Sequence, residues 1–129
     1  MSYYLAKTVT GEFDEVLARA VEVFKKEGFG VLTEIDVRET LRKKLGVEFR
    51  RYRILGMCNP PFAYQALQAE DKIGTMLPCS VVVQETPAGQ VEVAAIDPAA
   101  SMQAVGNPAL AGIAAEVREK LARAVAGLG

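Results

Sequence analysis

The sequence contains no histidine and no tryptophan, and only 2 of its 129 residues are cysteine. Histidine has the side-chain pKa closest to neutral pH, which makes it the commonest general acid–base group and a frequent metal ligand. Its absence excludes Ser-His-Asp triads, Cys-His dyads, HExxH zinc sites and zinc-deaminase signatures within one chain. No catalytic mechanism therefore follows from the sequence alone.

Neither sign of charge is in excess, and no long apolar run is present. The chain has 15 Lys and Arg residues against 16 Asp and Glu residues, and half of all residues are hydrophobic. This balance is typical of a globular protein and gives no overall attraction to nucleic acid. No segment approaches the roughly 18 apolar residues of a transmembrane helix, and the N-terminus lacks the pattern of a signal peptide.

The length predicts a single domain over residues 1–129, because domains of roughly 100 to 150 residues are the commonest. We expect a cytoplasmic protein with no membrane or nucleic-acid partner. In that compartment cysteines stay reduced. Cys58 and Cys79 are 21 positions apart, a spacing that matches no CxxC redox or zinc motif.

Apolar periodicity predicts alternating strands and helices. The predicted strands cover residues 3–8, 29–35, 51–58, 80–85 and 91–96. Two long helices are predicted over 13–27 and 108–128, and two short ones over 37–45 and 60–69. Helices at both ends of a run of strands favour an α+β fold. The simplest arrangement has β-α-β4-α order, with an antiparallel sheet of the second to fifth strands and the two long helices packed on one face.

Short motifs predict where the helices begin and end. Gly28 is expected to end the first long helix, with Phe29 packing back on Phe24. Asn59 and Asn107 each precede a proline. Asparagine is a favoured N-cap residue, and proline at the first helical position loses no helical hydrogen bond. The two Asn-Pro pairs therefore predict the starts of a short helix and of the last helix.

Chemically distinctive residues are predicted to meet at one edge of the sheet. In a meander the third strand ends at Cys58, the fourth begins near Cys79 and the fifth ends at Asp97. The alternation of side chains along a strand places these three on the helix-covered side, at the rim of the core. Together with the adjacent Asn59, they are the candidate ligand-binding residues.

Two interpretations of the cysteines stay open. In the functional one, the Cys58 thiol lies at the positive end of the following helix and has a lowered pKa. Cys79 would then resolve it as a disulfide, or both thiolates would bind a soft metal with Asp97 or a partner chain. In the structural one, both are small buried hydrophobic residues, as free cysteines commonly are.

The segment from Arg38 to Arg53 is locally basic, with seven basic and two acidic residues. Such a patch can attract an anionic ligand. It is also what helix ends and exposed strand faces commonly carry, and we expect Arg51 and Arg53 to share the outward face of their strand. No nucleic-acid or phosphate-binding motif accompanies the segment.

Strand alternation also predicts an apolar surface. It places Tyr52 and Ile54 on the helix-covered side with Cys58. The opposite face is predicted to carry Leu55, Met57, Val82, Ala94 and Ile96. Contiguous exposed apolar patches usually mark an interface. We interpret this one as a homodimer surface, unless another part of the chain covers it.

Several spaced motifs together resemble the bacterial and archaeal family known as domain of unknown function 302. The motifs are FDEV at 13–16, EGFGVLTEIDV at 27–37, YRILGMCNPP at 52–61, IGTMLPCSVVV at 73–83 and AIDP at 95–98. The resemblance implies a small α+β protein similar in architecture to the TATA-box-binding protein, and a homodimer. It implies no activity, but its CNP and LPC motifs match Cys58-Asn59-Pro60 and Leu77-Pro78-Cys79.

Three functions remain in competition. The first is a homodimeric module that binds a small molecule or a soft metal at the sheet edge near Cys58, Asn59, Cys79 and Asp97. The second is a protein-interaction or structural dimer without a ligand. The third is a thiol-dependent redox sensor or enzyme that uses Cys58.

Overall fold

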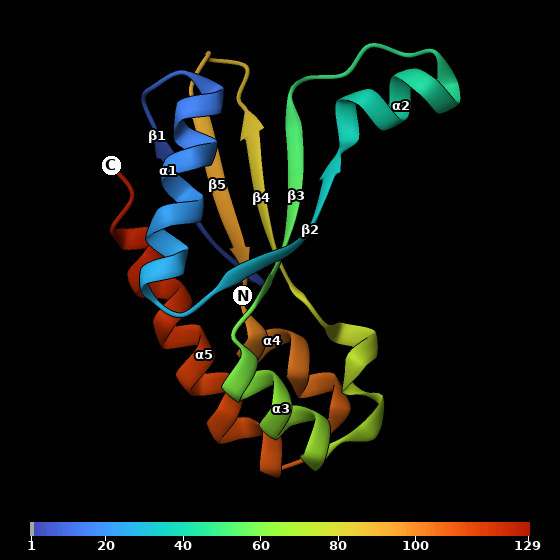
Figure 1. The fold of residues 1–129 in the computed structure, drawn as a ribbon, viewed down its shortest axis with the longest axis vertical. Helices are drawn as coiled ribbons and strands as arrows, with labels where there is room; N and C mark the ends of the chain where they lie inside the picture. The colour runs from blue at the N-terminus through green and yellow to red at the C-terminus, as the bar shows by residue number, and fades with distance from the viewer. Residues whose placement is uncertain (1) are drawn as a thin grey trace.

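The computed structural model describes residues 2–129, which form a five-stranded antiparallel sheet with helices on one face and at one end (Figure 1). The strand order is β1-β5-β4-β3-β2. The strands are β1 (Tyr4–Val9), β2 (Gly30–Asp36), β3 (Tyr52–Cys58), β4 (Cys79–Glu85) and β5 (Val91–Ile96). The α+β fold predicted from the sequence is confirmed.

The helices include the two long ones that periodicity predicted. They are α1 (Phe13–Lys26), α2 (Val37–Leu45), α3 (Pro60–Ala69), α4 (Pro98–Met102) and α5 (Ala109–Ala126). Two 3-10 segments, η1 (Asp71–Met76) and η2 (Gln103–Val105), lie in regions predicted to be turns or connections. The structure therefore has more short helical segments than the two insertions predicted.

The first strand also belongs to the sheet. The predicted sheet contained only the second to fifth strands. β1 pairs with β5 from Tyr4 opposite Ile96 to Val9 opposite Val91. The hairpin of β4 and β5 leaves one edge of β5 free, and β1 fills that edge. Sequence periodicity identifies strands but not their neighbours, so this pairing was not predictable from it.

Helices α1 and α5 pack on the same face of the sheet, as Figure 1 shows. The helical stripe of α1 is buried there, and so is that of α5. The fully buried side chains of this core include Val16, Phe24, Leu55, Val81, Val83, Val93 and Leu121. Burial of such side chains is worth about 1.5–3 kcal/mol each, so this layer supplies most of the stability of the fold.

The end of α1 follows the motif prediction. The Phe29 backbone N–H donates to the Phe24 carbonyl at 3.1 Å, and Gly28 has the positive φ angle that a helix C-terminus favours. The Phe24 and Phe29 rings meet edge to face with 6.3 Å between centroids. The chain therefore turns directly from α1 into β2.

The predicted faces of β3 are wrong. Leu55 pairs with Val81 and Met57 pairs with Cys79, so Leu55 and Met57 point to the helix-covered face and are fully buried. Tyr52 and Ile54 lie on the opposite, open face. The reason is that nearly every residue from 54 to 58 is apolar, so the alternation had no polar position to fix its phase.

The open face of the sheet carries Val82, Ala94 and Ile96, as predicted, together with Tyr4, Tyr52, Ile54 and Ile35. At one end, β2 and α2 extend away from the body of the molecule (Figure 1). Helix α2 buries none of its residues, and Leu45 at its end is 69 % exposed. No helix of residues 2–129 is long and apolar enough to cross a membrane.

The face assignment of β3 can be tested by truncating leucines. We expect Leu55→Ala to lower the free energy of unfolding by about 3 kcal/mol, because it removes a fully buried side chain from the core. Leu45→Ala, in an exposed position, should change it by less than about 0.5 kcal/mol. Chemical denaturation measures both, and equal effects would contradict the assignment.

Candidate functional site

An apolar pocket of about 300 Å³ lies at the end of the sheet where β3 finishes and β4 begins. Helices α3 and α5 and the η1 segment enclose it together with the strand ends. It is lined by Phe29, Leu32, Met57, Cys58, Asn59, Phe62, Ala63, Ala66, Leu67, Gly74, Leu77, Pro78, Cys79, Met102, Ile113 and Val117. None of these residues carries a charge. Its volume is at the lower end of the range for small-molecule sites.

Three of the four predicted site residues line this pocket: Cys58, Asn59 and Cys79. The pairing of Met57 with Cys79 makes Cys58 the residue that follows the last pair of β3 and β4. Asn59 comes next and precedes α3. The end of one strand, the start of its neighbour and a helix start therefore meet at one place, as the meander predicted.

Asp97 is not among the residues that line the pocket. Its carboxylate accepts a hydrogen bond from the Ala99 backbone N–H at 3.0 Å, which caps α4. Its other oxygen accepts from Nε of Arg118 on α5 at 2.9 Å. Asp97 is largely buried, and these two partners satisfy its charge. Its observed contacts join the end of β5 to α5.

Asn59 is 8 % exposed and is held by the end of α1. Its Nδ2 donates to the Glu27 carbonyl at 3.3 Å. A Cβ on Gly28 would lie 2.9 Å from that Nδ2, so the glycine leaves the space in which the amide sits. Asn59 occupies the N-cap position of α3, as predicted, but its side chain makes no capping hydrogen bond.

The two cysteines are free thiols that both line the pocket. Burial, together with the smaller effect of the neighbouring Cys58, raises the pKa of Cys79 to about 11. Cys79 is therefore a neutral thiol at physiological pH. No group of three or more His, Cys, Asp or Glu side chains within residues 2–129 is placed to hold a metal ion.

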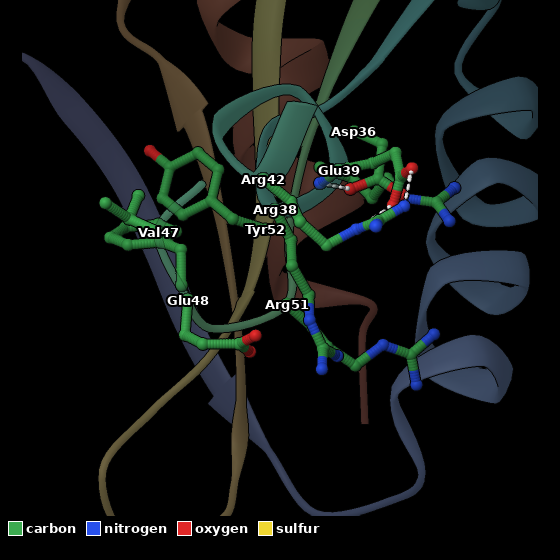
Figure 2. Close-up of a pocket in the computed structure, with 10 residues that line it drawn as sticks. Asp36, Arg38, Glu39, Arg42, Val47, Glu48, Arg51 and Tyr52 are labelled. Atoms are coloured by element: carbon green, nitrogen blue, oxygen red, sulfur yellow. Dashed lines mark hydrogen bonds and ion pairs between the residues drawn. The ribbon is translucent and has the colours of Figure 1, made fainter. Parts of the chain in front are cut away.

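A second, polar pocket of about 380 Å³ lies between α2, the loop after it and the start of β3 (Figure 2). Four arginines of the basic segment line it: Arg38, Arg42, Arg51 and Arg53. Acidic residues of the lining alternate with them, and Figure 2 shows Glu39 beside Arg42. The basic segment thus folds around a concave surface.

Most of the positive charge in this second pocket is already neutralised. Arg42 pairs with Glu39, and Arg53 with Glu34 and with Asp36 at 3.4 Å. An anion would have to compete with these carboxylates of the same chain. The pocket is therefore a network of internal ion pairs rather than an open anion site.

The expectation that Arg51 and Arg53 share the outward face of their strand is wrong. Arg53 pairs with Val83 and therefore lies on the helix-covered side of the sheet, and so does Arg51. The Arg51 guanidinium lies 4.3 Å from the centroid of the Phe13 ring and pairs with Glu12 and Asp14 at the start of α1. A cation over an aromatic face, with carboxylates at its edge, is a favourable packing. Arg51 therefore fastens the start of α1 to the sheet.

Comparison with known proteins places this chain in a family. The family model described as "Domain of unknown function DUF302" matches residues 5–128, nearly the whole chain. The chain belongs to the DUF302 family. The resemblance predicted from the sequence motifs is confirmed. No curated protein matched the chain.

A solved structure supports the membership. The DUF302 chain is similar to the crystal structure of an uncharacterized conserved protein DUF302 from Bacillus stearothermophilus, with 31 % sequence identity and a TM-score of 0.92. The match covers 100 % of both chains. The fold described above is therefore shared with that protein over its whole length.

Sequence reasoning missed the helical side of the pocket in the DUF302 chain. Phe62 comes from α3, Met102 from α4, and Ile113 and Val117 from α5. Each has the apolar character of an ordinary core residue, so nothing in the sequence distinguishes it. One feature of the sequence pointed to this lining indirectly. The predicted short helices carry apolar residues, and the sheet alone cannot bury all of them.

The raised pKa of Cys79 in the DUF302 chain predicts slow alkylation. In a Cys58→Ser variant, Cys79 should react with iodoacetamide far more slowly at pH 8 than free cysteine, because burial, the larger cause of its raised pKa, remains and keeps most of the thiol protonated. The rate should keep rising above pH 9. Mass spectrometry of timed samples measures it, and a rate plateau near pH 9 would contradict the burial argument.

Proposed function

We propose that this protein is a homodimeric module that binds a small, uncharged and largely apolar molecule in the pocket at the ends of β3 and β4. One observation carries the proposal: a pocket of about 300 Å³ in which no lining residue is charged. Ligand sites are typically concave and apolar, with a few polar groups that orient the ligand. The pocket has this composition.

The ligand should be uncharged because the lining offers no opposite charge. Transfer of an unpaired charge from water into an apolar site is costly. A soft metal ion would rest on the two thiols and on the Met57 and Met102 thioethers. Binding of such an ion would require Cys79 to lose its proton. That loss is unfavourable at neutral pH, because the pKa of Cys79 is raised to about 11.

A thiol-dependent role for Cys58 is a weaker candidate for the same reason. A resolving thiol acts as the thiolate, and Cys79 is protonated at neutral pH. The location of Cys58 in the pocket fits a ligand contact as well as a reactive group. The two roles separate experimentally, because a serine at position 58 keeps the shape of the pocket and removes the thiol.

The second copy is proposed to cover the open face of the sheet. All five strands contribute to this face, and Glu92 is its one charged position in the strand pairing. The solvent face of an antiparallel sheet normally carries mostly polar residues. On this one the polar residues are Thr8, Thr33, Ser80, Gln84 and Glu92, and the larger set is apolar or aromatic: Tyr4, Ala6, Ile35, Tyr52, Ile54, Val82, Ala94 and Ile96.

A second copy of this chain fits the face better than an unrelated partner, because two equal sheets pack face to face at about 10 Å and a two-fold contact needs no opposite charges. Glu92 lies toward one end of its strand, opposite Thr8 and Gln84, so a two-fold axis near Val82 keeps the two carboxylates apart.

Native mass spectrometry of freshly purified protein tests the ligand proposal. We expect a dimer that carries the mass of a bound organic molecule. Ala63→Leu, which fills part of the pocket lining, should remove that mass, and Cys58→Ser should keep it. A dimer that never carries an added mass would favour a protein-interaction role. A mass equal to that of a metal ion would contradict an uncharged ligand, and loss of the bound mass in Cys58→Ser would favour a thiol-dependent role.

The dimer surface is tested by one charge at the centre of the open face. Val82→Lys should convert the dimer to a monomer, because it buries an unpaired ammonium between two sheets. Ala115→Lys, on the exposed side of α5, is the matched control and should stay dimeric. Light scattering gives the mass, and circular dichroism checks the fold. A dimeric Val82→Lys protein would reject this surface.

A further inference from the structure

The chain uses the same Asn-Pro motif twice, and the two asparagines use their amide oxygens differently. Asn59 precedes α3, and Asn107 precedes the proline before α5. Each Nδ2 donates to a backbone carbonyl near the end of a distant helix: Glu27 for Asn59 and Ala69 for Asn107. The two motifs therefore fix their helices to the fold in the same way.

The amide oxygens behave differently. Oδ1 of Asn107 accepts a hydrogen bond from the Ala109 backbone N–H at 3.0 Å, so both ends of that amide are used. Oδ1 of Asn59 has no hydrogen-bond partner within residues 2–129, and it does not cap α3.

The free oxygen of Asn59 remains reachable. The side chain is 8 % exposed, yet no side-chain N or O atom within residues 2–129 is both sealed from solvent and without a partner. Oδ1 therefore keeps an opening, and the residue lines the apolar pocket. Because the Glu27 carbonyl can only accept, it holds Nδ2 toward itself and turns Oδ1 away from α1.

Asn59 is also the one residue of the pocket lining whose side chain carries oxygen or nitrogen. A polar group of this kind, placed once in an apolar pocket, sets the orientation and the chemistry of the ligand. A carbonyl oxygen accepts hydrogen bonds and repels a carboxylate. The matching group on the ligand is a neutral donor, such as a hydroxyl or an N–H.

We propose that Asn59 is the specificity-determining residue of the pocket and that the ligand is a compact apolar molecule with one neutral hydrogen-bond donor, of the phenol or alcohol class. The proposal rests on the proposed ligand-binding function and narrows it to a donor-bearing ligand. Cys58 and Cys79 contribute packing beside this donor, and the bond from Asn59 to Glu27 fixes the acceptor in place.

Three probes of similar size test the proposal: phenol, anisole and toluene. Anisole accepts a hydrogen bond but cannot donate one, and toluene does neither. Binding is followed by NMR of ¹³C-labelled methionine methyl groups. Met57 and Met102 line the pocket and should shift, whereas Met76 lies outside its lining and is the internal control. We expect phenol to bind about fivefold more tightly than anisole or toluene, although phenol is the best hydrated of the three.

Variants assign the preference to Asn59. Asn59→Ala should abolish the advantage of phenol and leave toluene binding within twofold. Leu67→Ala, which removes only apolar lining, should weaken all three probes alike. If Asn59→Ala fails to fold, the comparison of probes on the unchanged protein decides alone. Equal binding of phenol and toluene to the unchanged protein would overturn the proposal of a donor-bearing ligand but not the proposal that the pocket binds a ligand. Absence of shifts at Met57 and Met102 with every probe would overturn both.

Discussion

The fold depends on covering one face of a five-stranded sheet with two helices. α1 and α5 bury the apolar side of β1, β3, β4 and β5, and the deepest residues of that layer, such as Leu55 and Val93, are fully buried. The ends of β3 and β4 are covered instead by α3, η1 and α4, which form a second, small apolar cluster around Ile73 together with Leu110 of α5. The pocket lies where these two clusters meet.

Polar contacts hold the helical end against the sheet, and of the residues that make them only Asn59 lines the pocket. Asn107 joins α5 to the end of α3, Asp97 joins β5 to α5 through Arg118, and Asn59 joins the start of α3 to the end of α1. Each contact satisfies a buried polar group, which is the condition for placing it there. The pocket keeps an apolar lining because charged groups at this end are paired outside it.

Features set by neighbouring residues were predictable from the sequence, and features set by distant contacts were not. The end of α1 at Gly28 and Phe29 follows from local helix geometry, and the meeting of Cys58, Asn59 and Cys79 follows from a simple meander. Leu55 was assigned to the wrong face because its neighbours are apolar as well. The partner of Asp97 is Arg118, 21 residues away, and no local pattern links the two.

The central claim is that the space between the strand ends and α3 receives an uncharged apolar molecule. A crystal structure determined under xenon pressure tests it most directly, because xenon enters apolar cavities and carries no charge or hydrogen-bonding group. We expect a xenon atom in contact with Met57, Phe62 and Met102. A structure with no xenon there, in which Phe62 and Met102 fill the space, would contradict it.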